Sequence, residues 1–336
     1  MINERPLTDG TIALLNLEAQ IDALDPEVRH GRASVETRAG LTELISLRGL
    51  ILGRIADYDK AEEIAEQLVR DAPMNPQALL ARARTEAGFH RFNDALSHVD
   101  RAQELGLDPE TANGERAAIF QALGRYDESL VLREEAVERR ASFDNLAALV
   151  GLHAERGEIE AAERRYEDSR RQYRGVSPIP LALLDFQMGF MWMNEGRLDD
   201  ARTAFEAARR RVPAYAPTRG HLSEVEAELG EIDSAISRLR SLAASSDDPD
   251  YAAHLASILR DAGRLGESRH WRQVAAARYD ELVASHPEAF ADHAAEFWLA
   301  AGADPDKALR LAKMNVEVRN TPRARDLLAQ AIAAQA

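Results

Sequence analysis

The chain has 336 residues, of which 45% are hydrophobic and 29% charged, so it can bury a large core and is not a disordered segment. Its formal net charge of -15 argues against nucleic acid as a partner, because phosphate contacts require clustered lysine and arginine. The absence of cysteine excludes disulfides, thiolate metal sites and thiol nucleophiles.

The first predicted helix covers residues 8–24, which are amphipathic and begin at a capping residue, Thr8 or Asp9. This segment does not follow the pattern of the residues after it, so we assign 1–40 to N-terminal capping helices. The first residues lack an apolar signal core, and no run of 18 apolar residues exists. We therefore expect a soluble cytoplasmic protein without membrane insertion, or a periplasmic or secreted one if a signal peptide has been removed.

Residues 41–321 repeat one pattern, which predicts a series of helical hairpins. A small residue opens the second helix of each predicted hairpin, at Ala61, Ala95, Ser129, Ala162, Ala201, Ala235, Ser268 and Ala308. The successive spacings are 34, 34, 33, 39, 34, 33 and 40 residues. Five residues before the small residue a glycine recurs, at Gly124, Gly157, Gly196, Gly230 and Gly263.

Each repeated position has a physical reason. The glycine can adopt a positive φ and end the first helix of the hairpin. The small residue allows two helices to approach closely where they cross. Prolines such as Pro73, Pro109 and Pro213 cannot continue a helix and close several units. The composition, with only 6% aromatic residues, also favours helices over sheets.

The unit resembles the tetratricopeptide repeat (TPR), most clearly over residues 183–213. The matching positions there are Gly189, Gly196, Ala201, Phe205, Ala208 and Pro213. The resemblance implies an all-α fold, a right-handed superhelical solenoid of antiparallel helix hairpins with about eight repeats plus capping helices. We expect the array to cover 41–321 and a C-terminal capping helix to cover 322–336.

Two junctions depart from the regular spacing. The first lies near 175–181, where Pro178 and Pro180 close an extended loop. The second lies near 285–289, where a helix-like run from about Glu267 to Ser285 ends at a proline.

In the family that this unit resembles, the first helix of each hairpin lines the inner, concave surface. The corresponding partner-binding residues are Leu50, Arg54, Leu80, Arg84, Gln121, Phe186, Phe190, Met193, Asn194, Glu224, Arg260, His293 and Phe297. We expect Phe186 and Phe190 to face the groove, because exposed aromatic residues mark interfaces. We expect Met188, Met191 and Trp192 to be core residues.

Some members of the family bind a C-terminal carboxylate through lysine, asparagine and arginine on the first three units. The matching positions here are Ser46, Leu50, Leu80, Arg84, Gly114 and Ala118, and only Arg84 has suitable chemistry. We therefore reject that function for this chain.

The sequence contains no nucleophile elbow, phosphate-binding glycine loop or HExxH motif, so we predict neither an enzyme nor a cofactor. His221, His254 and His293 fall at almost the same position of three successive units. They are candidates for a metal site, as is the neighbouring group of His286, His293 and Glu296. Ordinary hydrogen-bonded histidines are the favoured interpretation, since neighbouring helices lie about 10 Å apart.

The leading hypothesis is a non-catalytic scaffold or adaptor that binds a protein or peptide on its concave face. An alternative is a sensor whose solenoid closes on a peptide or small molecule, suggested by the small inner residues Gly114, Ala147 and Gly151. A histidine-based metal-binding protein or enzyme is the third. The C-terminal helix also presents Leu327, Leu328 and Ile332, which suggests homodimerisation if they lack cover.

Overall fold

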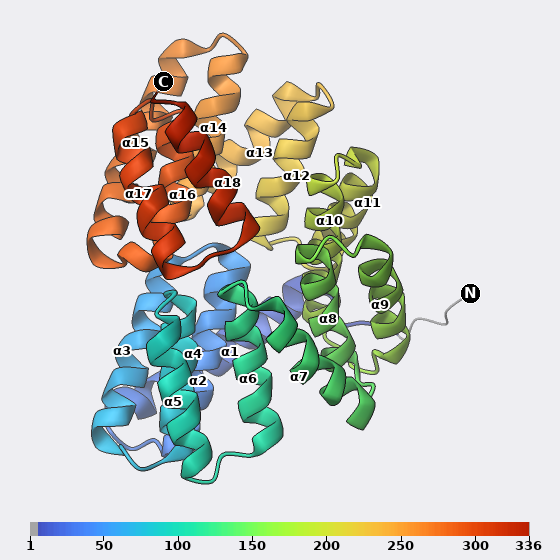
Figure 1. Cartoon of the computed structure of the whole chain (residues 1–336), viewed down its shortest axis with the longest axis vertical. Helices are drawn as coiled ribbons and strands as arrows, with labels where there is room; N and C mark the ends of the chain where they lie inside the picture. The colour runs from blue at the N-terminus through green and yellow to red at the C-terminus, as the bar shows by residue number, and fades with distance from the viewer. Residues whose placement is uncertain (1–5, 336) are drawn as a thin grey trace.

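The computed structural model describes residues 6–335, which form 18 helices and no strand (Figure 1). The predicted all-helical solenoid is confirmed. Eight consecutive hairpins run between a first helix, α1 (Gly10–Arg29), and a last helix, α18 (Pro322–Ala333). The hairpins are α2 (Val35–Leu52) with α3 (Ile55–Asp71), α4 (Pro76–Gly88) with α5 (Phe92–Glu104), α6 (Pro109–Ala122) with α7 (Tyr126–Arg139), α8 (Phe143–Glu155) with α9 (Ile159–Gln172), α10 (Ile179–Asn194) with α11 (Leu198–Arg211), α12 (Ala216–Glu228) with α13 (Ile232–Ser245), α14 (Pro249–Asp261) with α15 (Leu265–Ser285), and α16 (Pro287–Leu299) with α17 (Pro305–Val318).

The small residues that open the second helices are all buried at the crossing with the first helix. Two of them are serines rather than alanines, and both use the same hydrogen bond. Ser129 Oγ donates to the carbonyl oxygen of Ala117 at 2.7 Å, and Ser268 Oγ donates to that of Ala256 at 2.7 Å. A serine is tolerated here because the facing helix satisfies its hydroxyl.

The turn inside each hairpin needs one residue in the left-handed region. The five predicted glycines have φ between 70° and 87°. Two hairpins lack glycine there, and His90 (φ 58°) and Ala303 (φ 54°) adopt the same conformation. A residue with a Cβ pays about 1 kcal/mol in that region, so the packing of the hairpin, not glycine itself, imposes the turn.

The structure moves one predicted boundary. Residue 41, the expected start of the array, lies inside α2, which begins at Val35 after its cap Ser34. Only α1 therefore precedes the hairpins. At the other end, Leu327 of α18 is 4% exposed and covered by the terminal core, whereas Ile332 is 54% exposed.

The winding of the hairpins brings the first helices against the later ones (Figure 1). Leu17 and Ile21 of α1 and Ile45 of α2 share a hydrophobic cluster with Val212 and Tyr215, which lie between α11 and α12. Gly10 lies so close to Arg211 that a Cβ would stand 2.0 Å from its carbonyl oxygen. The sequence analysis did not predict this closure.

A row of polar contacts continues the closure, and we call it the seam. Asp247, between α13 and α14, accepts hydrogen bonds from the backbone nitrogens of Ile55 at 2.6 Å and Ala56 at 3.0 Å. These are the first residues of α3, whose own N-cap residue, Arg54, makes no side-chain capping bond. Asp247 therefore caps a helix 192 residues away in sequence.

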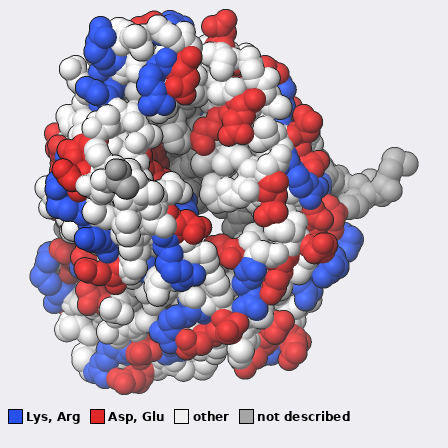
Figure 2. All heavy atoms as spheres, turned by 45° about the horizontal axis from the view of Figure 1, so that its top comes forward, with Lys and Arg blue, Asp and Glu red and all other residues white. Residues whose placement is uncertain are grey.

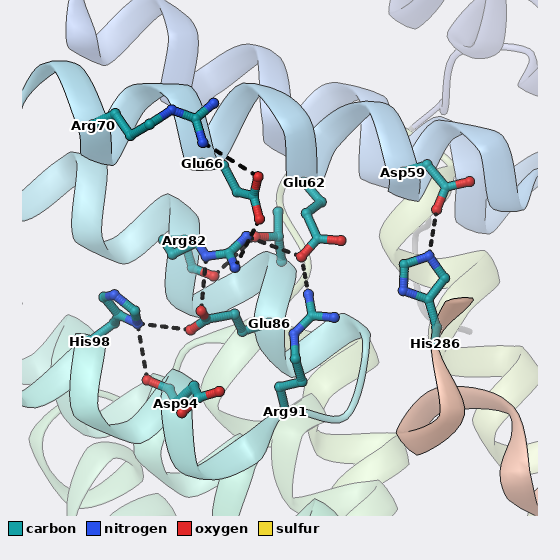
Figure 3. Close-up of polar contacts among 11 residues, drawn as sticks. Asp59, Glu62, Glu66, Arg70, Arg82, Glu86, Arg91, Asp94, His98 and His286 are labelled. Carbon is teal, nitrogen blue, oxygen red and sulfur yellow. Dashed lines mark hydrogen bonds and ion pairs between the residues drawn. The ribbon is translucent and has the colours of Figure 1, made fainter. Parts of the chain in front are cut away.

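The seam extends to the turn between α4 and α5. His286 Nε2 lies 2.9 Å from Asp59 Oδ1 of α3 (Figure 3), and its ring stacks on Phe89 at a centroid distance of 4.0 Å. His90 Nδ1 donates to the carbonyl oxygen of Glu288 at 3.1 Å. Burial lowers the pKa of His90 to about 4, so this ring is neutral near pH 7.

An ionic network connects α3 to α4 and α5 behind the seam (Figure 3). Arg82 lies between Glu62 at 3.0 Å and Glu86 at 2.8 Å. The second oxygen of Glu86 lies 2.8 Å from His98 Nδ1, which raises the pKa of that histidine. These partners hold the first two hairpins in register, so we assign them a structural role.

Candidate binding surface on the inner face

The inner face follows the first helices of the hairpins. In Figure 1, α9 and α11 lie on the outer side of α8 and α10. Figure 2 shows that the molecule is hollowed, with acidic side chains along the edge of the hollow. The candidate surface is built on α10, α12, α14 and α16.

Three half-buried rings form what we call the aromatic wall: Phe186, Phe190 and His221. The two phenylalanine centroids are 6.4 Å apart, and the His221 ring lies 5.2 Å from Phe190 and 5.5 Å from Phe186. Behind them, Phe205 of α11 is fully buried. Its ring occupies the space beside Gly189, where a Cβ would approach it to 2.6 Å, so the glycine fixes how close α10 and α11 come.

The rest of α10 divides between core and surface. Met188 and Met191 are buried, as predicted, at 0% and 3% exposure. Trp192 is half-buried and donates from Nε1 to Glu163 Oε1 at 3.0 Å. Met193 is half-buried and Asn194 is exposed, so they continue the surface beyond the aromatic wall.

A series of ion pairs, the charge ladder, crosses from α12 to α16. It consists of Glu224, His254, Asp250, His293 and Asp292. Glu224 Oε1 lies 2.9 Å from His254 Nδ1, and Asp250 Oδ2 lies 3.0 Å from His293 Nδ1.

Further groups are paired with the ladder. Asp292 pairs with Arg319, and Asp250 accepts a hydrogen bond from the buried hydroxyl of Tyr279. Glu296 Oε1, one turn further along α16, lies 2.8 Å from Arg323 Nη2 of α18. These contacts connect the inner helices to α15 and to the end of the chain.

The pKa values follow from these contacts. Burial opposes the charged form of His254, but the attraction of Glu224 outweighs it and raises the pKa to about 9. Asp250 and Asp292 raise the pKa of His293 to about 10. Burial alone would raise the pKa of Glu224, yet the neighbouring histidines hold it well below its usual range. At neutral pH the ladder therefore consists of ions of alternating sign.

The three histidines that we considered as metal ligands do not converge. His221 of α12 and His254 of α14 both approach Glu224, whereas His293 of α16 pairs with Asp250 of α14. Within residues 6–335, no three histidine, aspartate or glutamate side chains are arranged to hold a metal ion. The geometry favours ion-paired histidines.

Three predicted partner-binding residues lie elsewhere. Leu80 is 4% exposed in the core of the α4–α5 hairpin, and Phe297 is 3% exposed and stacks on Tyr279. Leu80 packs with Phe92 and Val99 of α5 in its own hairpin, whereas Phe297 lies against α15 of the preceding hairpin. Both side chains are therefore core residues and not groove residues. Arg54 lies outside α2, in the turn before α3.

The other predicted residues vary in exposure and pairing. Leu50 is half-buried against the core shared by α1 and α2. Arg84 lies between Glu43 and Glu115, and Gln121 donates to Glu155 at 2.7 Å. Arg260 is exposed at the end of α14 beside Asp261. The closure of the solenoid places Leu50 in the same hydrophobic cluster as Phe186 of the aromatic wall, whereas Arg84 and Gln121 pair with carboxylates on other hairpins.

Two acidic members of the ladder were missed from the sequence. Asp250 stands in the first turn of α14, a position where an acid is expected without any special role. Asp292 precedes a histidine that we had singled out, His293. Asp250 lies four residues before His254, and Asp292 directly precedes His293. This proximity to histidines that we had already singled out was the available signal in the sequence.

Comparisons with known proteins agree with this fold. A family profile described as "Tetratricopeptide repeat" matches residues 193–258, which span the end of α10 to α14. No curated protein matches the chain in sequence. None of the described helices is both long and apolar enough to cross a membrane.

Solved structures resemble the chain at low identity. A human IFIT1 dimer with m7Gppp-AAAA matches with a TM-score of 0.59 and 15% identity, over 91% of this chain and 72% of that one. A monomeric IFIT1 mutant with the same ligand matches with a TM-score of 0.59 and 14% identity, over 95% of this chain and 76% of that one. The APC/C hetero-tetramer Cut9-Hcn1 matches with a TM-score of 0.50 and 16% identity, over 94% of this chain, which spans only 55% of its relative. At these identities the likeness concerns the fold alone.

Proposed function

We propose that this chain, of which residues 193–258 match the tetratricopeptide repeat, is a non-catalytic scaffold that holds a peptide or partner protein on the inner face of its solenoid. Proteins with this repeat fold generally serve as protein-interaction scaffolds. The observation that carries the proposal is the aromatic wall. Phe186 and Phe190 are only half-buried, and both stand on α10, the first helix of its hairpin. Rings held in this way by a packed support are typical anchors for a partner.

The charge ladder supports a binding role rather than a catalytic one. Its acids and histidines are already paired with each other, and the pairing moves the pKa values of His254 and His293 to about 9 and 10, far from neutral. A general acid or base needs a pKa near the working pH. The ladder would instead fix α12, α14 and α16 as a firm backing for the aromatic wall.

Nucleic acid stays an unfavoured ligand. The IFIT1 structures were solved with m7Gppp-AAAA, whose phosphates need unpaired cations. Here Arg84, His254, His293 and Arg323 are each paired with a carboxylate. A cytoplasmic location remains a prediction from the sequence.

The test is binding of a partner isolated from the native host and then purified. Phe190→Ala should weaken its affinity by about tenfold or more, because the ring contributes the contact area of an anchor residue. The matched control is Val131→Ala, a truncation of an apolar side chain that is 55% exposed on the outer helix α7. Equal affinity of both variants, with unchanged melting temperatures, would remove the aromatic wall from the interface.

A further inference from the structure

A separate recess lies in the N-terminal half of the inner face. It has a volume of about 380 Å³ and is lined by residues of α2, α3 and α4. The residues that matter here are Glu43, Ser46, Tyr58, Arg84, Gly88 and Phe89. The volume is at the lower end of the range for small-ligand sites and suits one long side chain.

The ion-paired groups beside the recess carry a net negative charge. Arg84 donates from Nε to Glu115 Oε1 at 2.7 Å, its Nη2 lies 2.6 Å from the same oxygen, and its Nη1 pairs with Glu43. Two carboxylates thus surround one guanidinium and leave one net negative charge. The Glu43 side chain is 55% exposed, so it can still meet a ligand. Arg84, with its donors engaged, is poorly suited to an anion.

The walls suit the stem of a basic side chain. Tyr58 presents an aromatic ring, and burial together with the charge of Asp248 raises the pKa of its hydroxyl, which therefore stays neutral. Aromatic rings attract organic cations through the face of the ring. Phe89 closes one end and is fixed there by the stacked ring of His286. Because Tyr58 lies near Asp248 and Phe89 lies against His286, the closed seam holds both walls of the recess in place.

We propose that this recess receives a basic side chain, either an ammonium or a guanidinium group, carried by the partner segment. The inference rests on the proposed function, since it assigns the cation to the partner held on the inner face. An apolar side chain would leave the net negative charge of the carboxylates without a cationic partner. An anionic one would be repelled by Glu43 and Glu115.

The first test uses amino-acid amides and needs no partner. N-acetyl-arginine amide is titrated into the full chain by NMR, beside the citrulline amide, which has the same shape without the charge. A charged hydrogen bond contributes about 1.5 kcal/mol or more, so the arginine amide should bind about tenfold more tightly. Equal binding of the two amides, or no binding of the arginine amide, would overturn the inference.

Two variants localise the binding. Gly88→Leu should fill the recess, because a Cβ at this helical glycine meets nothing within 4 Å, and should reduce arginine amide binding about tenfold. Gly114→Leu is the matched control, since its Cβ also meets nothing within 4 Å on the next first helix. Glu43→Gln should weaken the arginine amide several-fold and leave the citrulline amide unchanged, whereas Glu228→Gln, exposed on α12, should alter neither. Full arginine amide binding by Gly88→Leu would contradict the assignment.

The purified partner separates this inference from the proposed function. Gly88→Leu should weaken partner binding while Gly114→Leu does not. If the arginine amide binds but the Gly88→Leu variant binds the partner at full affinity, the partner does not supply the cation and the inference fails. The scaffold proposal is unaffected by that result, because it is tested by Phe190→Ala alone. If Phe190→Ala does not change partner binding and the amides still bind as expected, the proposal that the aromatic wall contacts the partner is rejected instead.

Discussion

The α6–α7 and α14–α15 hairpins follow the same repeat but differ inside. In α7 only Ser129 is buried, and Val131 is 55% exposed. Among the first helices, α6 buries three of its 14 residues, whereas α14 buries seven of its 13. The helix α14 also carries two members of the charge ladder, Asp250 and His254. The repeat positions therefore fix where the helices lie, while residues outside the pattern decide how firmly each hairpin is held.

The largest expected effect comes from breaking the ladder at Asp250. Asp250→Ala removes the partner of His293 and the acceptor of the buried Tyr279 hydroxyl. We expect a loss of about 2 kcal/mol in the free energy of unfolding by urea, reduced from the value for a fully buried pair because His293 is partly exposed. Asp261→Ala, at the exposed end of the same helix, should cost less than about 0.5 kcal/mol. Similar losses in the two variants would show that the ladder is not what holds α14.

Alkaline pH should weaken the ladder and spare α6–α7. The pKa values of His254 and His293 rise from 6.5 in the unfolded chain to about 9 and about 10 in the fold. Their stabilisation is therefore complete below pH 6.5 and is lost as the pH rises through 9 to 10, when Glu224, Asp250 and Asp292 lose their cationic partners.

Hydrogen exchange, corrected for its intrinsic pH dependence, measures this difference. Between pH 7 and pH 10.5 the protection of α12, α14 and α16 should fall more than that of α6–α7, which has no histidine. The Tyr279 hydroxyl, Arg319 and Arg323 also face the ladder, but burial and the nearby carboxylates raise the pKa of Tyr279 well above 10, and arginine stays charged. A uniform loss of protection would contradict the comparison.

The seam joins the two regions, and Asp247→Ala should loosen it. The substitution removes the cap of α3 and should lower the free energy of unfolding by about 1 kcal/mol. Faster hydrogen exchange should appear at Ile55 and Ala56 first. Asp233→Ala is the control, because this exposed acid also lies in the first turn of a helix but makes no capping bond. An equal loss of unfolding free energy in both variants would show that the seam does not stabilise the fold.

The smallest effect concerns the turn without glycine. Ala303 is exposed and has a φ of 54°, so Ala303→Gly should relieve backbone strain. Part of that gain is offset by the greater flexibility of glycine in the unfolded chain, which leaves a net stabilisation of about 0.5 kcal/mol. His90, in the equivalent turn, should gain less on the same change because it also donates to Glu288. A melting temperature that falls in Ala303→Gly would contradict this explanation.

The sequence predicted local features well. The small residues from Ala61 to Ala308 and the glycines from Gly124 to Gly263 marked the hairpins, because each acts within its own unit. The inner-face positions were less reliable. An error in the assumed rotation of a helix moves a side chain from the groove to the core, which is what happened to Leu80 and Phe297.

The contacts between distant units could not be predicted. Asp247 reaches Ile55 only because small rotations between successive hairpins add up along the array. Asp247 lies two residues before α14, yet the helix that it caps is α3 and not α14. The charge ladder was predicted only in part. The sequence placed His254 and His293 at almost the same position of successive units, but their acidic partners depend on the spacing between hairpins.

Photo-crosslinking tests the central claim most directly. Benzoylphenylalanine replaces Asn194, which is exposed beside the aromatic wall, or Val131, which is exposed on the outer helix α7. The account predicts that the purified partner is crosslinked from position 194 and not from position 131, and that Phe190→Ala reduces the yield at 194. Crosslinking from 131 with none from 194 would contradict binding on the inner face.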